Sequence, residues 1–310
     1  MRAILRRAWF GPLAALAAVY LLFSGLAPDT FTGAVNLATM ARQTAVVAVT
    51  SLGMTFVILL GGIDLSVGSG VALTGVVVAR ALQSGSGGFS AAALGVLVAA
   101  LAGLTNGALT ARVKITPFIV TLGSMSVLRG VAKGLAGEQK IDADPRGLDH
   151  LMSAGSATSL PAGVWVALGL AALGAFALEY TVFGRHVVAI GSNANTARLC
   201  GVPVERVMLA VYALAGALTG VAGVLEFSTL TVGDPTDSIG LELEAIAAVV
   251  IGGGSLAGGQ GSVAGAMIGA LLMTVIKTGC THVGVPNWVQ EISTGVIIVV
   301  AVGIDRLRRR

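Results

Sequence analysis

Long apolar runs separated by short polar stretches dominate the pattern of this 310-residue chain. About 20 residues of helix cross a hydrocarbon core of ~30 Å, and runs near that length recur from end to end. Ten spans are therefore predicted, at about 10–27, 44–60, 65–82, 89–111, 117–136, 161–182, 207–227, 241–252, 261–280 and 288–304. The eighth is short for a full crossing, so we expect it to be tilted, extended by flanking polar turns, or re-entrant.

The longest polar stretch after residue 160 is 184–206, and it carries the signals of a short helix. The side-chain oxygen of Asn193 or Asn195 can cap a helix by accepting a free backbone N–H. Gly201 suits the left-handed residue that closes a helix, and Pro203 fits the first turn of the next one. The pattern predicts a short helix held between two spans, with an ordinary solvated loop as the alternative.

Two glycine-rich stretches interrupt apolar runs in a similar way. Residues 61–68 read GGIDLSVG and residues 252–259 read GGGSLAGG. Both follow even-numbered spans and so face the same side, which indicates an internal repeat with the same orientation in each half. The candidate residues of the first broken-helix motif are Gly61, Gly62, Asp64, Ser66 and Gly68. We expect the Asp64 carboxylate to accept N–H groups of the turn, with substrate contact as the alternative.

Small and polar residues inside the spans supply further candidates. Gly261, Gly265 and Gly269 are four residues apart, a spacing that places glycines on one helix face and permits close helix contact. Asn106, Thr121 and Lys277 are polar residues within predicted spans. Ionisable residues there are costly and are functional candidates, although most of them lie near span ends, where snorkelling explains them. We take these three as candidates for a translocation path.

Composition agrees with this pattern. The chain is 55% hydrophobic and 11% charged, against roughly 25% charged residues in soluble domains. We therefore expect an all-α, polytopic transmembrane bundle forming a single domain over residues 1–310. Cys200 and Cys280 form no metal or disulfide pattern. The run 252–261 lacks the Gly-Lys-Ser/Thr ending of an ATP-binding loop. No catalytic residue, metal or cofactor is therefore predicted.

Basic residues orient the chain, because cytoplasmic loops carry an excess of Lys and Arg. With the N-terminus in the cytoplasm, the inside segments hold Arg2, Arg6, Arg7, Arg112, Lys114, Arg185, Arg198, Arg206, Arg306, Arg308, Arg309 and Arg310. The outside loops are acidic, and the longest of them is 137–160. Both termini and the stretch 184–206 are then cytoplasmic, and the net charge of +4 requires no nucleic-acid partner. The first apolar run resembles a signal peptide, but we expect an uncleaved span.

Four stretches together resemble one known family. They are GGIDLSVGS at 61–69, NGALTARVKITPFIVTLGSMSVLRG at 106–130, GRHVVAIGSNANTARLCGVPVERV at 184–207 and ELEAIAAVVIGGGSLAGGQGSVAG at 242–265. In these stretches the chain resembles the permease subunits of bacterial ribose/xylose/arabinose-type ABC importers. The resemblance covers almost the whole chain.

The resemblance implies a non-enzymatic transport subunit in the bacterial inner membrane, in contact with lipid. Its implied partners are an ATP-binding cassette subunit inside, a periplasmic sugar-binding protein outside, and a second permease copy or a paralogue. The stretch 184–206 then becomes the coupling loop that sits in the ATPase cleft. Its candidate coupling residues are Gly191, Asn193, Ala197, Arg198 and Gly201.

The solute remains open at this stage. Lys277 and Thr294 depart from the family pattern. In that pattern we would expect an asparagine near position 277 and a basic residue at position 294. A permease of the same architecture for a nucleoside, an autoinducer-like sugar or a branched-chain amino acid is one alternative. A stand-alone secondary carrier is another, although the sequence shows no pair of midplane carboxylates of the kind that a coupled carrier needs.

Overall fold

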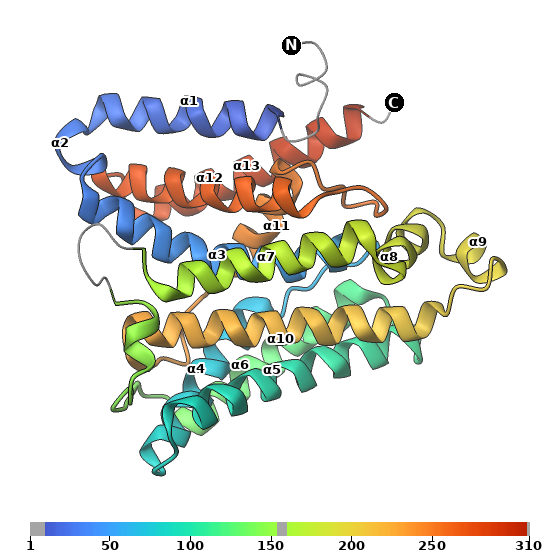
Figure 1. Cartoon of the computed structure of the whole chain (residues 1–310), viewed down its shortest axis with the longest axis horizontal. Helices are drawn as coiled ribbons and strands as arrows, with labels where there is room; N and C mark the ends of the chain where they lie inside the picture. Colours follow the sequence, from blue (N-terminus) through green and yellow to red (C-terminus); the bar gives the residue numbers. More distant parts are fainter. Residues whose placement is uncertain (1–9, 154–159, 309–310) are drawn as a thin grey trace.

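The structure, a computed structural model, describes residues 10–153 and 160–308 and is built mainly of helices that lie along one common axis, horizontal in Figure 1. In chain order the elements are α1 (Phe10–Leu26), α2 (Pro28–Phe31), α3 (Ala34–Leu59), α4 (Val67–Gln83), α5 (Gly88–Ala111), α6 (Pro117–Ala136), β1 (Ile141–Asp142), the 3-10 helix η1 (Leu148–Leu151), α7 (Ala162–Tyr180), α8 (Val182–Ser192), α9 (Ala194–Leu199), α10 (Val204–Leu230), β2 (Val232–Gly233), α11 (Leu241–Ile251), α12 (Val263–His282) and α13 (Asn287–Arg308).

Each of the ten predicted spans coincides with one helix to within a few residues, except that α3 begins ten residues earlier than expected. Among the described residues, six helices are long and apolar enough to cross a membrane, namely α3, α5, α6, α7, α10 and α12. α1, α4 and α13 contain shorter apolar segments. α11 has 11 residues, about 16 Å of helix, which is about half of the hydrocarbon core. The chain is thus an all-α membrane bundle, while the number of complete crossings stays a prediction.

Local sequence explains where several helices begin and end. The Ser262 hydroxyl accepts the N–H of Gly265 and caps α12. Pro117 stands in the first turn of α6, where its missing N–H costs nothing. The sequence predicted that Gly261, Gly265 and Gly269 lie on one helix face, and this is wrong for Gly261. Because α12 begins only after the Ser262 cap, Gly261 lies in the preceding loop.

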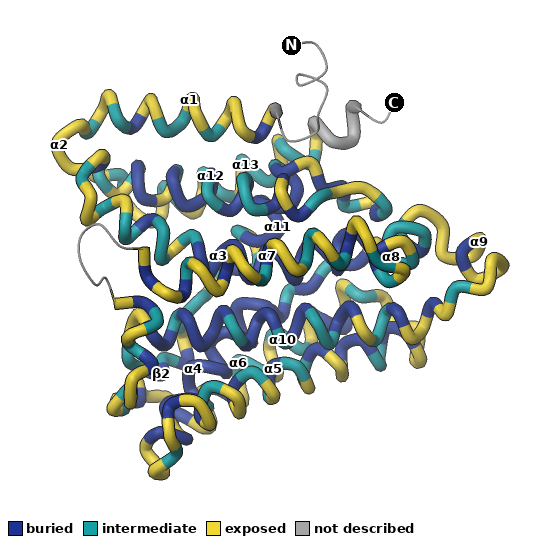
Figure 2. Tube along the Cα trace, viewed as in Figure 1, coloured by how far each residue is buried: buried dark blue, intermediate teal, exposed yellow. Residues whose placement is uncertain are grey.

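The core of the bundle is formed by α3 and α10. In its most apolar 18-residue stretch, α3 is 83% buried, whereas the corresponding values are 22% for α5 and 17% for α6. α10 packs against α5, α3 and α4, and α12 packs against α3, α11 and α1. Figure 2 shows the buried inner helices and the exposed outer surfaces of α1 and α5. The exposed surfaces are apolar, as expected where lipid or another membrane protein replaces water.

The two ends of the bundle carry different elements. α8, α9, the start of α1 and the end of α13 lie at one end, and α2 and η1 lie at the other (Figure 1). Which of these ends faces the cytoplasm is a prediction from charge. Part of that charge count rests on Arg2, Arg6, Arg7, Arg309 and Arg310, which lie outside the described residues, as do residues 154–159 of the predicted outer loop. The side chains of Arg306 and Arg308 are also outside the described part. The position of the termini relative to the membrane stays a prediction.

Candidate functional site: a polar cavity and a projecting helix

The break between α3 and α4 is held by a buried hydrogen-bond network around Asp64. Oδ1 of Asp64 accepts the backbone N–H of Ser66 at 2.9 Å and the Ser66 hydroxyl at 2.6 Å. The Nδ2 group of Asn106 donates to the Ser66 oxygen at 3.0 Å, and Ser124 donates to Oδ1 of Asn106. The carboxylate is 3% exposed. The turn is therefore fixed to α5 and α6, because hydrogen bonds connect Ser66 to Asn106 and Asn106 to Ser124.

Thr121 supports the same break from α6. The residue is fully buried, and its hydroxyl lies within hydrogen-bond distance of two carbonyl oxygens, that of Ile63 at 3.1 Å and that of Pro117 in its own helix at 3.0 Å. Two of the three candidate path residues, Asn106 and Thr121, thus brace the α3–α4 turn in this structure. The third, Lys277, lies elsewhere, beside a cavity. That Asn106 and Thr121 line a solute path stays a prediction.

The second glycine-rich stretch lies directly against the first. The N–H of Gly259 donates to the carbonyl oxygen of Leu59 at 2.9 Å. A Cβ added to Gly258 would lie 3.0 Å from Cα of Gly61 and 2.7 Å from the oxygen of Gly191. Gly61 has a φ of +86°, which a side chain would strain. The backbones of the two broken-helix stretches therefore meet here, and Gly191, a predicted coupling residue, lies against them. This close contact explains why the residues have small side chains.

The remaining glycines of the first motif are also crowded. A Cβ on Gly62 would lie 2.6 Å from the hydroxyl of Tyr212, and one on Gly68 would collide with Glu242 and with the backbone of Ser238. At both positions a residue with a Cβ would have to displace these neighbours, so glycine fits best.

Glycines of α12 let its backbone approach α11. A Cβ on Gly265 would collide with the carbonyl oxygen of Gly252, and one on Gly269 with that of Ala248. The sequence predicted close packing at both positions from their spacing alone. The partner helix, α11, is apparent only in the structure.

The projecting helix α9 has the caps that the sequence indicated. Oδ1 of Asn193 accepts the N–H of Thr196 at 2.9 Å, and Gly201 follows the helix with a φ of +84°. The sequence did not predict that residues 182–192 form a separate helix, α8. The signal for it was Thr181, whose hydroxyl accepts the N–H of Gly184 at 3.2 Å.

α9 extends beyond the rest of the bundle at the end opposite η1 (Figure 1). Ala197 is 6% exposed and packs inward, whereas Leu199 is 89% exposed. Asn193 and Arg198 are also exposed. Leu199 is a candidate residue for contact with a partner protein, and the sequence did not predict it. An apolar side chain between two spans does not indicate a contact until its orientation is known.

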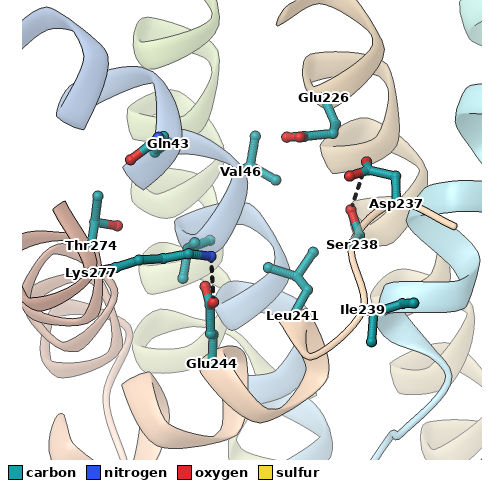
Figure 3. A pocket seen from close by; sticks show the side chains of 11 residues that line it. Gln43, Val46, Glu226, Asp237, Ser238, Ile239, Leu241, Glu244, Thr274 and Lys277 are labelled. Carbon is teal, nitrogen blue, oxygen red and sulfur yellow. Dashed lines mark hydrogen bonds and ion pairs between the residues drawn. The ribbon is translucent and has the colours of Figure 1, made fainter. Parts of the chain in front are cut away.

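A polar cavity of about 290 Å³ lies near the opposite end of the bundle, between α3, α10, α11 and α12 (Figure 3). Its polar lining residues come from these helices and from the loop before α11: Gln43, Glu226, Asp237, Ser238, Glu244, Thr274 and Lys277. Val46, Val47, Ile239 and Leu241 complete the wall. The Lys277 ammonium group and the Glu244 carboxylate form an ion pair at 2.7 Å that joins α12 to α11. Of the charged lining, the sequence reading singled out Lys277 but did not select Glu226 or Glu244 as site residues.

The loop that covers one side of this cavity is fastened to the predicted outer loop. β1 pairs with β2 in antiparallel register, with Ile141 opposite Gly233. Lys140 forms an ion pair with Asp234 at 3.1 Å. Partial burial raises the pKa of Asp234, but hydrogen bonds from Thr236 and the charge of Lys140 outweigh it, so the pKa lies below its usual value. Arg129 donates to the carbonyl oxygens of Pro235 and Asp237 at 2.9 and 2.7 Å.

Possible metal ligands do not gather at one place in the part of the chain that the structure describes. No group of three or more His, Cys, Asp and Glu side chains is arranged to hold a metal ion there. Cys200 and Cys280 are both free. What the described residues offer is a chamber at one end, a projecting helix at the other, and packed broken helices between them.

These features fit a multi-pass membrane protein, and comparison with known proteins gives its family. A family profile described as "Branched-chain amino acid transport system / permease component" matches residues 36–302. The chain belongs to this permease family.

Individual relatives are similar over most of their length. The chain is 37% identical to the ribose import permease protein RbsC of Escherichia coli K12, over 96% of this chain and 93% of the relative. It is 37% identical to the L-arabinose ABC transporter permease protein AraH of Azospirillum brasilense, over 88% and 80%. It is 32% identical to the D-allose transport system permease protein AlsC of Escherichia coli K12, over 96% and 91%. No solved structure matches the chain significantly.

Proposed function

We propose that this chain is the membrane-spanning permease subunit of an ATP-driven importer of monosaccharides in the bacterial inner membrane. The observation that carries the proposal is full-length similarity to permeases whose names specify ribose, arabinose and allose. The polar cavity supports it, because a sugar needs hydrogen-bonding groups along its path. The chain acts as a transport subunit, and we assign ATP hydrolysis to a separate ATP-binding cassette partner.

We assign the end that bears α8 and α9 to the cytoplasm. Arg185, Arg198 and Arg206 lie in or beside these helices, as the distribution of basic residues in membrane proteins requires. α9 is then the coupling helix, with Asn193, Arg198 and Leu199 exposed toward an ATPase. Ala197 and Gly201 fix its position, and Gly191 lets α8 lie directly against the two broken-helix stretches. A motion of α9 would thus be transmitted through α8 to the two broken-helix stretches at the centre of the bundle.

The remaining partners follow from the same arrangement. The cavity end faces the periplasm, where a sugar-binding protein delivers the solute to the outer loops. A second permease, either a copy or a paralogue, covers part of the exposed apolar surface. The matching glycine-rich breaks support an internal repeat that frames the path between the two permeases.

A branched-chain amino acid is the second candidate solute, because the family description names that class. The test is uptake by proteoliposomes that contain the permease, its ATPase and its binding protein. D-ribose, L-arabinose, D-allose and L-leucine are each supplied as radiolabelled solute. We expect accumulation of at least one of the sugars and none of leucine. Uptake of leucine alone would replace the sugar assignment with the amino-acid one.

A further inference from the structure

The cavity described above contains a carboxylate that no protein group satisfies. Glu226 projects from α10 into the space between α3 and the loop before α11 (Figure 3). Among the described residues, its carboxylate forms no hydrogen bond or ion pair. An ionisable group within a membrane helix is costly unless something offsets that cost. A ligand that donates hydrogen bonds would do so.

The other polar groups of the cavity are mostly paired, and this leaves Glu226 as the main free acceptor. Glu244 is bound to Lys277, and a carboxylate oxygen of Asp237 accepts the Ser238 hydroxyl at 3.0 Å. The amide oxygen of Gln43 accepts the Thr278 hydroxyl at 3.2 Å, so its NH₂ group is the part left to donate. A solute with several hydroxyl groups can donate to Glu226 and accept from Gln43 at the same time.

Charge restricts which solute can enter. Three carboxylates and one ammonium group give the lining a formal net charge of −2. A cavity with one sign of charge and apolar walls concentrates its electrostatic potential. Val46 and Leu241 supply such walls, and they also suit the C–H face of a sugar ring. An anionic solute such as a sugar acid is repelled, whereas a neutral polyol meets acceptors without a charge penalty.

We propose that this cavity is a solute chamber that admits neutral polyhydroxy solutes and rejects anionic ones, with Glu226 as the principal hydrogen-bond acceptor. The Lys277–Glu244 ion pair sets the charge of the chamber, since loss of either partner shifts the net charge by one. The inference rests on the proposed function and deepens it by naming the solute class and the residues that select it.

The first test measures the potential of the chamber. Ser238→Cys places a thiol in the cavity wall, and Ser84→Cys places a matched thiol in the exposed loop after α4, at the same end of the bundle. Both are made in a Cys200→Ser, Cys280→Ser background and studied in the complete transporter. The rates of reaction with cationic MTSET and anionic MTSES are compared. We expect a cation-to-anion rate ratio at residue 238 at least about tenfold above that at residue 84.

Charge variants make this test specific. Glu226→Gln and Glu244→Gln should lower the ratio at residue 238, and Lys277→Gln should raise it. Glu179→Gln, the same change at an exposed site on α7, should leave it unchanged. Equal ratios at residues 238 and 84, or no response to the three lining variants, would overturn the charge argument. Thr274→Cys on α12 repeats the measurement if Ser238→Cys does not fold.

The second test concerns the solute. D-ribose should slow labelling at residue 238 and not at residue 84, its anionic analogue D-ribonate should not, and Glu226→Gln should abolish the protection. Glu226→Gln should also reduce D-ribose uptake about tenfold, the order expected for loss of a charge-assisted hydrogen bond. Protection and uptake that are unchanged in Glu226→Gln, in a transporter that imports ribose, would overturn this inference alone. A wild-type complex that imports no sugar would instead overturn the proposed function and this inference with it.

Discussion

Asp64 shows how one side chain fixes a backbone break. Its oxygen accepts both polar hydrogens of Ser66, and the network continues through Asn106 to Ser124. The sequence indicated that Asp64 caps the turn, because a carboxylate two residues after a Gly-Gly pair and before an apolar run has N–H groups within reach. The extension to α5 and α6 could not be predicted, since it depends on how helices distant in sequence pack.

The Asp64 network leads to a prediction about two substitutions. Asp64→Asn keeps an oxygen that accepts from Ser66, so the variant should retain most of its thermal stability and uptake. Asp64→Leu leaves a buried N–H and a hydroxyl unpaired and should cost roughly 2–6 kcal/mol of unfolding free energy, at about 1–3 kcal/mol for each group. Thermal unfolding in detergent is the measurement, with Asp142→Leu at an exposed site as the control. Equal stability of all three variants would remove Asp64 from the account.

The contact between α11 and α12 shows what glycine spacing alone predicts. Gly265 and Gly269 were expected to lie at a close contact, and both face carbonyl oxygens of α11. The prediction that Gly261 lies on the same helix was wrong for a local reason, because α12 begins two residues later, after the Ser262 cap. Glycine spacing identifies a face, but only a cap signal identifies where the helix begins.

Close contact at Gly265 predicts a strong steric effect. Gly265→Leu drives a side chain into the Gly252 backbone, and overpacking of this kind costs about 1–3 kcal/mol even where neighbours can adjust. We expect less monodisperse protein in size-exclusion chromatography and a lower unfolding temperature. Gly295→Leu is the matched control, because nothing lies within 4 Å of a Cβ at that position on α13. Normal yield and stability of Gly265→Leu would show that α12 does not depend on this contact.

α9 carries a prediction about coupling. Ala197→Asp places a charge at a packed position, whereas Ala194→Asp places the same charge at an exposed site in the first turn of the helix. The first variant should lower sugar-stimulated ATPase activity and uptake about tenfold, since burying an unpaired charge displaces the helix, and the second should leave both near wild type. Gly201→Pro should resemble Ala197→Asp, because proline cannot adopt the positive φ at this position. If Ala197→Asp and Gly201→Pro retain full stimulated activity, α9 is an ordinary loop helix.

In the whole molecule, the pattern of apolar residues predicted where the helices lie, but it did not predict how far each helix is buried. Ten apolar runs became ten helices because a run of that length must satisfy its own backbone hydrogen bonds in lipid. The cavity was not predictable, since Gln43, Glu226 and Lys277 are far apart in the sequence and converge only through packing. The pattern did predict a short eighth span at 241–252, and α11 has 11 residues, but the burial of most of that helix is evident only in the structure.

Topology is tested by labelling single cysteines in the Cys200→Ser, Cys280→Ser background. Pro145→Cys and Pro235→Cys should react with a membrane-impermeant maleimide added to intact spheroplasts. Asn195→Cys should react only after the membrane is opened. Labelling of residue 195 from outside would contradict the assignment of α9 to the cytoplasm.

In the proposed transporter the chain forms a path whose transport is driven by a separate ATPase. The most direct measurement is D-ribose accumulation in proteoliposomes with the permease, ATPase and binding protein, loaded with ATP or with a non-hydrolysable analogue. We predict accumulation with ATP, none with the analogue, and none when the ATPase subunit is omitted. Accumulation by the permease alone, driven by a proton or sodium gradient, would contradict the account and identify a secondary carrier.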